Sequence, residues 1–122
     1  MQCLTHVLRP LLFIAALAVT GNAIAKDVVV DELFCDSLAL MSKAGAEAKQ
    51  RGESEAKWRS NLIALRGYVV KNKDNVLYSI LPKVQEEVST VYSARRTPID
   101  TYIASYNNCM GNEYGNVVTL NY

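Results

Sequence analysis

Apolar side chains recur at intervals of three and four residues through most of the chain, which is the spacing of one face of an α-helix. Four stretches show this spacing: residues 31–51, 54–70, 76–96 and 97–110. The pattern predicts an all-α fold, a compact antiparallel array of about four helices.

The first stretch is apolar around most of its circumference. Its in-phase positions are Phe34, Leu38, Met41, Gly45 and Ala48. Leu33, Leu40 and Ala44 widen that face, so we expect this helix to be largely buried. Small residues in its second half indicate the close approach of a neighbouring helix. Asp31 is the expected N-cap, and Gly52 is expected to end the helix.

In the second stretch, Ser54 is the expected N-cap and Trp58 the expected core anchor. The polar segment 71–75 then breaks the pattern. An alternative interpretation is a β-hairpin across this break, pairing residues 68–70 with 76–78.

The third stretch keeps its helical phase through a proline. The in-phase residues are Leu77, Ile80, Leu81, Val84, Val88 and Val91. Because Pro82 removes a backbone donor, two structures fit: one helix kinked near Pro82, which the unbroken phase favours, or a short turn followed by a helix. Glu86 and Glu87, with Arg95 and Arg96, resemble a solvated face.

The fourth stretch opens with an acidic variant of the capping box, in which Thr97 caps, Pro98 takes the first helical position and Asp100 reciprocates. Its apolar stripe consists of Ile99, Tyr102, Ile103, Tyr106 and Met110. Gly111 is the expected left-handed stop. Residues 112–122 are expected to form a flexible C-terminal tail, with strand addition to a partner as an alternative.

Residues 1–25 have the pattern of a signal peptide that is cleaved after Ala25. Arg9 precedes the apolar run 11–19, and small residues occupy the two recognition positions of 23–25. The run is too short to span a bilayer, so no stable membrane anchor is expected after cleavage. We therefore expect a periplasmic or secreted protein.

Cleavage changes the composition of the chain. Of 122 residues, 97 remain, enough for a single helical domain over 26–111. Cys3 and the one histidine, His6, are removed. Removing Arg9 from the 13 basic residues leaves 12, which balance 12 acidic ones. A neutral chain gives no electrostatic reason to expect nucleic acid as a partner.

Cys35 and Cys109 are the two cysteines of the mature chain. In an oxidising compartment such a pair predicts one structural disulfide, and two thiols without histidine make a metal site a poor alternative. Cys35 lies near the start of the first predicted helix and Cys109 near the end of the last. In an antiparallel array the two ends meet only if the number of helices is even, which favours four helices over three.

The mature chain lacks the groups that most enzymes use. Without histidine, triad catalysis and histidine acid–base chemistry are excluded. Phosphate loops, paired Cys-x-x-Cys motifs and EF-hand loops are also missing from the sequence. The remaining acidic pairs are Asp31/Glu32, Glu53/Glu55 and Glu86/Glu87, whose side chains diverge on a helix. We expect no enzyme activity, no cofactor and no metal.

Tyrosine offers the clearest candidate for a binding surface, because it is enriched at protein interfaces. The seven tyrosines are at positions 68, 78, 92, 102, 106, 114 and 122. We expect Tyr102 and Tyr106 to be half-buried core residues. Tyr92, beside Arg95 and Arg96, is the predicted partner-binding surface.

Short motifs at the ends of the predicted helices carry a family resemblance. Phe34-Cys35 opens the first helix, Arg51-Gly52 closes it, Val91-Tyr92 ends the third, and Cys109 finishes the last. With the signal peptide, this arrangement resembles a loose set of small, uncharacterised exported bacterial and phage helical proteins with one disulfide. In that set an Arg-Gln-Gly break and an Ala-Tyr pair are typical; here Gln50-Arg51-Gly52 reverses the order and Val91 replaces the alanine.

The resemblance implies a fold and an exported location but no activity. Exported acid chaperones and the periplasmic immunity proteins of secretion systems share this architecture, and architecture alone does not transfer function. Export, missing catalytic groups and a tyrosine-rich, charge-balanced surface favour a module that binds a protein partner, such as an inhibitor or immunity factor. The alternatives are a periplasmic stress chaperone and a small-ligand carrier. The oligomeric state is left open.

Overall fold

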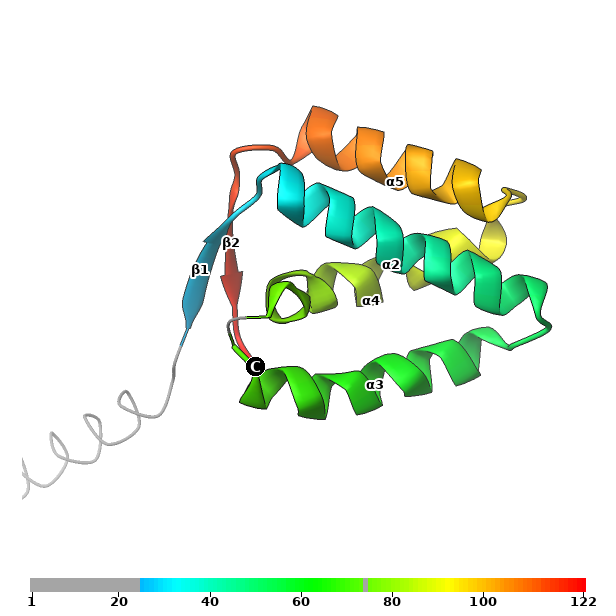
Figure 1. The fold of residues 1–122 in the computed structure, drawn as a ribbon, viewed down its shortest axis with the longest axis horizontal. Coiled ribbons are helices and arrows are strands. Elements are labelled where there is room, and N and C mark those ends of the chain that lie inside the picture. The colour runs from blue at the N-terminus through cyan, green and yellow to red at the C-terminus, as the bar shows by residue number, and fades with distance from the viewer. Residues whose placement is uncertain (1–24, 74) are drawn as a thin grey trace, which may run out of the picture.

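The computed structural model describes residues 25–73 and 75–122, so the predicted signal peptide lies outside the described residues apart from Ala25. The described chain folds into four helices and two short strands (Figure 1). In chain order they are β1 (Lys26–Val29), α2 (Glu32–Gln50), α3 (Glu55–Lys71), α4 (Val76–Ser93), α5 (Pro98–Asn112) and β2 (Val117–Leu120). The prediction of about four antiparallel helices is confirmed. The alternative hairpin across 71–75 is wrong, because its two arms belong to α3 and α4.

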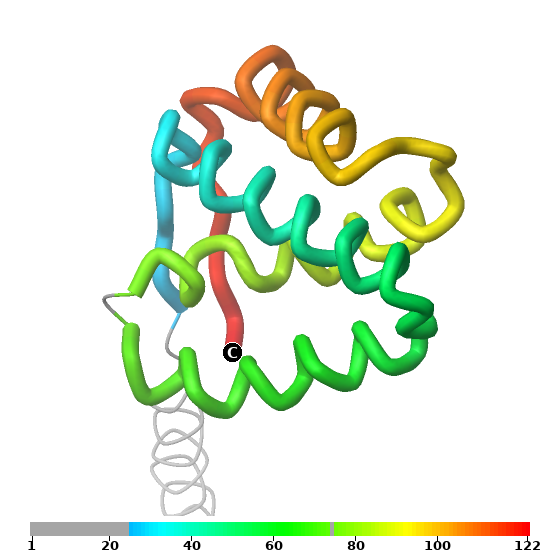
Figure 2. The backbone as a smooth tube through the Cα atoms, turned by 45° about the vertical axis from the view of Figure 1, so that its right-hand side comes forward, coloured from blue at the N-terminus to red at the C-terminus, as the bar shows by residue number. Residues whose placement is uncertain are grey.

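The helix α2 lies at the centre of the array. It packs along α5 on one side and α4 on the other, and α3 packs mainly on α4. Figures 1 and 2 show α5 and α3 on opposite sides of α2. The largest fully buried side chains come from the four helices, from β2 and from the residue after β1: Val30, Cys35, Leu38, Leu62, Val69, Ile80, Leu81, Val88, Cys109 and Leu120.

Side-chain caps fix where the helices begin. Asp31, Ser54 and Thr97 each accept a hydrogen bond from the N–H three residues on, as predicted, and Asn75 caps α4 in the same role. At the end of α2, Gly52 has φ +84° and its N–H donates to the carbonyl of Lys49. This left-handed turn confirms Gly52 as the stop of the first helix.

Close approach of two helices is confirmed at Gly45. A Cβ at this position would lie 3.0 Å from Nε1 of Trp58 and 3.5 Å from Cγ1 of Val91. The missing side chain therefore lets α3 and α4 pack directly against α2.

The helix α4 is continuous through Pro82. It changes direction early in its course, with its first turn seen nearly end-on in Figure 1. Proline has no N–H to donate to the carbonyl of Tyr78 four residues back. The hydroxyl of Tyr122 donates to that carbonyl oxygen instead, at 2.6 Å. The single kinked helix is the correct alternative, and the last residue of the chain completes its hydrogen bonding.

The C-terminal segment differs from the predicted flexible tail over 112–122. Residues 117–120 form β2, which pairs antiparallel with β1 from Lys26↔Leu120 to Val29↔Val117. Leu120 is buried, and the rings of Tyr78 and Tyr122 stack with their centroids 4.5 Å apart. The domain therefore extends past residue 111 to the end of the chain.

The predicted stop at Gly111 is also wrong. Gly111 lies inside α5, which ends at Asn112. The left-handed glycine is Gly115, with φ +85°. Its N–H donates to the carbonyl of Val30, and the N–H of Val30 donates to the carbonyl of Asn116. These two bonds join Val30, which follows β1, to the turn that precedes β2.

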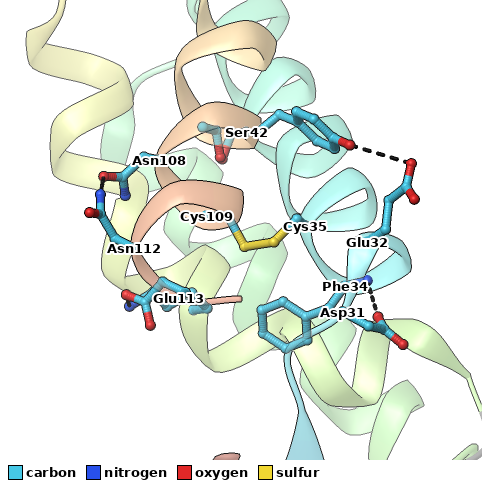
Figure 3. Close-up of a disulfide and its surroundings, with 12 residues drawn as sticks. Asp31, Glu32, Phe34, Cys35, Ser42, Asn108, Cys109, Asn112 and Glu113 are labelled. Carbon is cyan, nitrogen blue, oxygen red and sulfur yellow. Dashed lines mark hydrogen bonds and ion pairs between the residues drawn. A yellow bond between two sulfur atoms is a disulfide. The ribbon is translucent and has the colours of Figure 1, made fainter. Parts of the chain in front are cut away.

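The predicted disulfide between Cys35 and Cys109 is present, with the two Cα atoms 5.5 Å apart. It links the first turn of α2 to the last turn of α5 (Figure 3). An even number of antiparallel helices brings these two turns together, as the sequence predicted. Within the described residues, no helix combines the length and apolar character needed to cross a membrane.

Candidate functional site

The outer side of the α2–α5 pair is held by two tyrosines of α5. The hydroxyl of Tyr102 donates to Oδ1 of Asp36, and that of Tyr106 donates to Oε1 of Glu32 at 3.4 Å. Glu32 lies near the disulfide in Figure 3, where a dashed line marks its hydrogen bond. These two bonds lie one helical turn apart and set the antiparallel register of the two helices.

Four aliphatic side chains flank the tyrosines and are open to solvent. Leu33, Leu40, Ile99 and Ile103 are between 49 % and 62 % exposed. The prediction that Leu33 and Leu40 widen a buried face is wrong, and Ile99 and Ile103 lie on the part of the predicted apolar stripe that is open to solvent. The antiparallel register places Leu40 opposite the first turn of α5, which contains Ile99.

We call this surface the tyrosine face: Glu32, Leu33, Asp36, Leu40, Ile99, Tyr102, Ile103 and Tyr106. The rings of Tyr102 and Tyr106 stack with centroids 5.9 Å apart and an interplanar angle of 10°. The hydrogen bond to Asp36 raises the pKa of Tyr102, and desolvation raises the pKa of Tyr106. Both hydroxyls therefore stay protonated at neutral pH and act as donors.

A shallow groove of about 400 Å³ runs along the tyrosine face. It is lined by Glu32, Leu33, Asp36, Tyr102 and Tyr106. Two carboxylates and two aromatic rings thus face the groove, and no lysine or arginine is among its lining residues in the described part of the chain. This combination suits an apolar contact with a basic group beside it.

A second feature is a cleft of about 310 Å³ between α4 and α5, with α2 as its floor. The carboxylate of Glu87 accepts hydrogen bonds from Oγ of Ser42 at 2.8 Å and Oγ of Ser105 at 3.2 Å. Three helices thus contribute to one polar centre. The predicted solvated face over Glu86 and Glu87 is correct for exposed Glu86 but wrong for partly buried Glu87.

The surroundings of Glu87 disfavour its charged form. Burial raises the pKa of its carboxyl above the ordinary glutamate range, although both serine hydroxyls oppose the shift. The nearest cation on its helix, Lys83, makes ion pairs with Glu113 at 3.1 Å and Glu86 at 3.4 Å instead. Glu87 is therefore a half-buried carboxylate that is held by hydroxyl groups.

The predicted surface of Tyr92, Arg95 and Arg96 is not gathered into one site. The hydroxyl of Tyr92 donates to the backbone carbonyl of Glu53 at 3.1 Å, and its half-buried ring packs against the core. Arg95 is exposed, and Arg96 lines the α4–α5 cleft. Tyr92 thus joins α4 to the turn after α2, while Arg96 faces another part of the molecule.

The partly buried position of Glu87 was not predicted, although the helical phase of the sequence contains a signal for it. Glu87 lies three residues after Val84 and four before Val91, both buried. A carboxylate on the apolar face of a helix is a sign of a specific environment. Leu33 and Leu40 also lie to one side of the main apolar stripe of α2. Whether that side of α2 is covered depends on the packing of α5, which the sequence pattern does not specify.

The described residues contain no group of three or more His, Cys, Asp and Glu side chains placed to hold a metal ion. The absence of a metal and other cofactors remains a prediction. Comparison with protein-family models, curated proteins and solved structures found no match. The geometry of the tyrosine face and of the α4–α5 cleft is therefore the basis for proposing a function.

Proposed function

We propose that this chain is an exported binding protein that acts by occupying another protein through the tyrosine face. The supporting observation is the set of half-exposed aliphatic residues around the stacked pair of Tyr102 and Tyr106. Contiguous exposed apolar surface of this kind is typical of sites that another protein covers. Tyrosine adds a large rigid contact area with one polar end.

The tyrosine face is organised before any partner arrives. Each ring is fixed by a hydroxyl bond to a carboxylate on the neighbouring helix, and the disulfide holds α2 against α5 at the same end. Side chains that are already ordered lose less conformational entropy on binding. The face therefore suits recognition by a rigid surface.

Charge indicates the chemistry of the partner. Glu32 and Asp36 are acidic, and the lining residues of the groove contain no basic side chain to neutralise them. A partner that presents an arginine or lysine between apolar residues would complement both the carboxylates and the aromatic rings. We therefore commit to a protein partner with a basic, partly apolar contact surface.

The proposed location is outside the cytoplasm. A disulfide is typical of an oxidising compartment, and the first 25 residues have the pattern of a signal peptide. An inhibitor or immunity-type module would act in this way, by occupying a protein surface without catalysis.

Affinity capture from extracts of the native organism tests the proposal. The immobilised mature protein is compared with Leu33→Lys and Ile103→Lys, which add positive charge at two exposed positions of the face, and with Ile63→Lys as the matched control. Ile63 is 64 % exposed on α3, away from the face. We expect the two face variants to lose a specific captured protein by about tenfold or more and the control to retain it.

Three outcomes would contradict the proposal. Equal capture by all variants would place the contact elsewhere. Failure to capture any protein would remove the partner, and capture of only the chain itself would indicate self-association. Thermal unfolding followed by circular dichroism verifies that each variant is folded.

A further inference from the structure

The α4–α5 cleft contains a carboxylate with spare binding capacity. Oε2 of Glu87 accepts from both serines, whereas Oε1 accepts no hydrogen bond from any described residue. A half-buried carboxylate is costly unless it is paired. Its two hydroxyl partners orient the group, and Lys83, the cation that acts on it from the same helix, is already paired with Glu113 and Glu86.

The only cation that lines the cleft among the described residues is Arg96. It forms no ion pair with any carboxylate in the described part of the chain. The wall of the cleft also includes the apolar side chains of Val91, Ala94 and Ala104. The cleft therefore offers a negative group, an apolar wall and a positive group.

The size of the cleft limits what it can hold. Its volume of about 310 Å³ is at the lower end of the range of small-molecule sites, about 300–1,000 Å³. A compound of the size of a single amino acid fits this space, whereas a larger organic ligand would extend into solvent.

We propose that the α4–α5 cleft binds a small zwitterion of the amino-acid class, with its ammonium group on Glu87 and its carboxylate toward Arg96. The ammonium group donates to Oε1 of Glu87, and the apolar part of the ligand lies along Val91 and Ala104. Charge-assisted hydrogen bonds of this type are about twice as strong as neutral ones. This site is on a different side of α5 from the tyrosine face and is independent of the proposed function.

Three probes that share the isobutyl group of leucine separate the two charges. L-leucine carries both, isoamylamine carries only the ammonium group, and 4-methylpentanoate carries only the carboxylate. Titration of the mature protein is followed by the NMR amide shifts of Ser42, Glu87 and Ser105. With each probe added at millimolar concentration, we expect leucine to bind most tightly, isoamylamine to bind more weakly and 4-methylpentanoate not to bind measurably.

Each charged residue has a matched control next to it. Glu87→Gln is expected to weaken leucine binding by about tenfold or more, while Glu86→Gln, on the exposed neighbour, leaves it unchanged. Arg96→Ala is expected to reduce leucine affinity toward that of isoamylamine, and Arg95→Ala is the control. Because Glu87→Gln removes a half-buried charge and keeps an amide oxygen for the serines, it is expected to remain folded at neutral pH.

Binding is also expected to depend on pH with a defined sign. The ammonium group needs the ionised carboxylate, so leucine affinity falls as the pH is lowered through the pKa of Glu87. The charged groups near this carboxylate are Lys83, Glu86 and Arg96. The Glu86→Gln variant removes the contribution of Glu86 to this pH dependence.

The proposal would be overturned if millimolar leucine and isoamylamine leave the three amide shifts unchanged. It would also be overturned if Glu87→Gln and Glu86→Gln bind leucine equally well. Tighter binding of 4-methylpentanoate than of isoamylamine would show that the cleft selects anions and would contradict the role of Glu87.

Discussion

Pro82 deprives the carbonyl of Tyr78 of its helical donor, and the hydroxyl of Tyr122 supplies a donor in its place. Burial raises the pKa of Tyr122 to about 12, which keeps its proton available as the donor at all ordinary pH values. The cations of Lys26 and Arg66 lie over the rings of Tyr78 and Tyr122 at 5.4 and 5.6 Å. The end of the chain is thus part of the core of the domain.

A double-mutant cycle tests this relation at the residue scale. Tyr122→Phe is expected to lower the free energy of unfolding by about 1–2 kcal/mol, because it leaves the Tyr78 carbonyl without a donor. In a Pro82→Ala background the backbone N–H is restored, and the same change is expected to cost at least about 0.5 kcal/mol less. Urea unfolding measures all four proteins.

Equal costs of Tyr122→Phe in the two backgrounds would contradict the relation. They would mean that the Tyr122 hydroxyl acts independently of the donor that proline removes. The stacking of the two rings is retained in every variant and cancels from the comparison.

At the scale of elements, the helices could be predicted because their signals are local. Asp31, Ser54 and Thr97 cap the helices where the sequence indicated, and Gly52 ends α2. These features depend only on residues within one helical turn. The observed bounds of all four helices therefore lie close to the predicted ones.

The pairing of β1 with β2 could not be predicted in the same way. Each strand has four residues, and the register pairs Lys26 with Leu120, which lies far from it along the sequence. No turn sequence connects them, and the packing of the helices between them places the two strands side by side. For this reason a β-prone tail resembled a flexible one.

Exposure was the least predictable property of the candidate site. The apolar spacing of Leu33 and Ile103 identifies helix faces but does not specify which neighbour covers them. The role of Glu87 likewise depends on the meeting of Ser42 and Ser105 from two other helices. Both sites arise from the packing of α5 against α2, which is a non-local arrangement.

The disulfide is the covalent link between those two helices. Replacing both Cys35 and Cys109 with alanine is expected to lower the free energy of unfolding by about 4 kcal/mol, because the cross-link restricts the unfolded chain over 74 residues. Denaturant unfolding of the double variant, beside the oxidised wild type, measures the difference. A loss below about 1 kcal/mol would show that the strand pair and the core hold the chain ends without it.

At the scale of the whole molecule, α5 presents a different surface on each of two sides. Tyr102 and Tyr106 contribute to the tyrosine face, while Ser105 and Asn108 line the α4–α5 cleft. The disulfide and the strand pair secure the same end of the helical array (Figure 1). The disulfide and the strand pair therefore support both surfaces with residues that belong to neither of them.

Site-specific photo-crosslinking in the native organism tests most directly whether another protein covers the tyrosine face. A benzoylphenylalanine residue is placed at Ile103 on the face and, as the matched control, at Ile63 on α3. We predict a discrete adduct with another protein from position 103 and none from position 63. Adducts of equal yield from both positions, or no adduct from position 103, would contradict it.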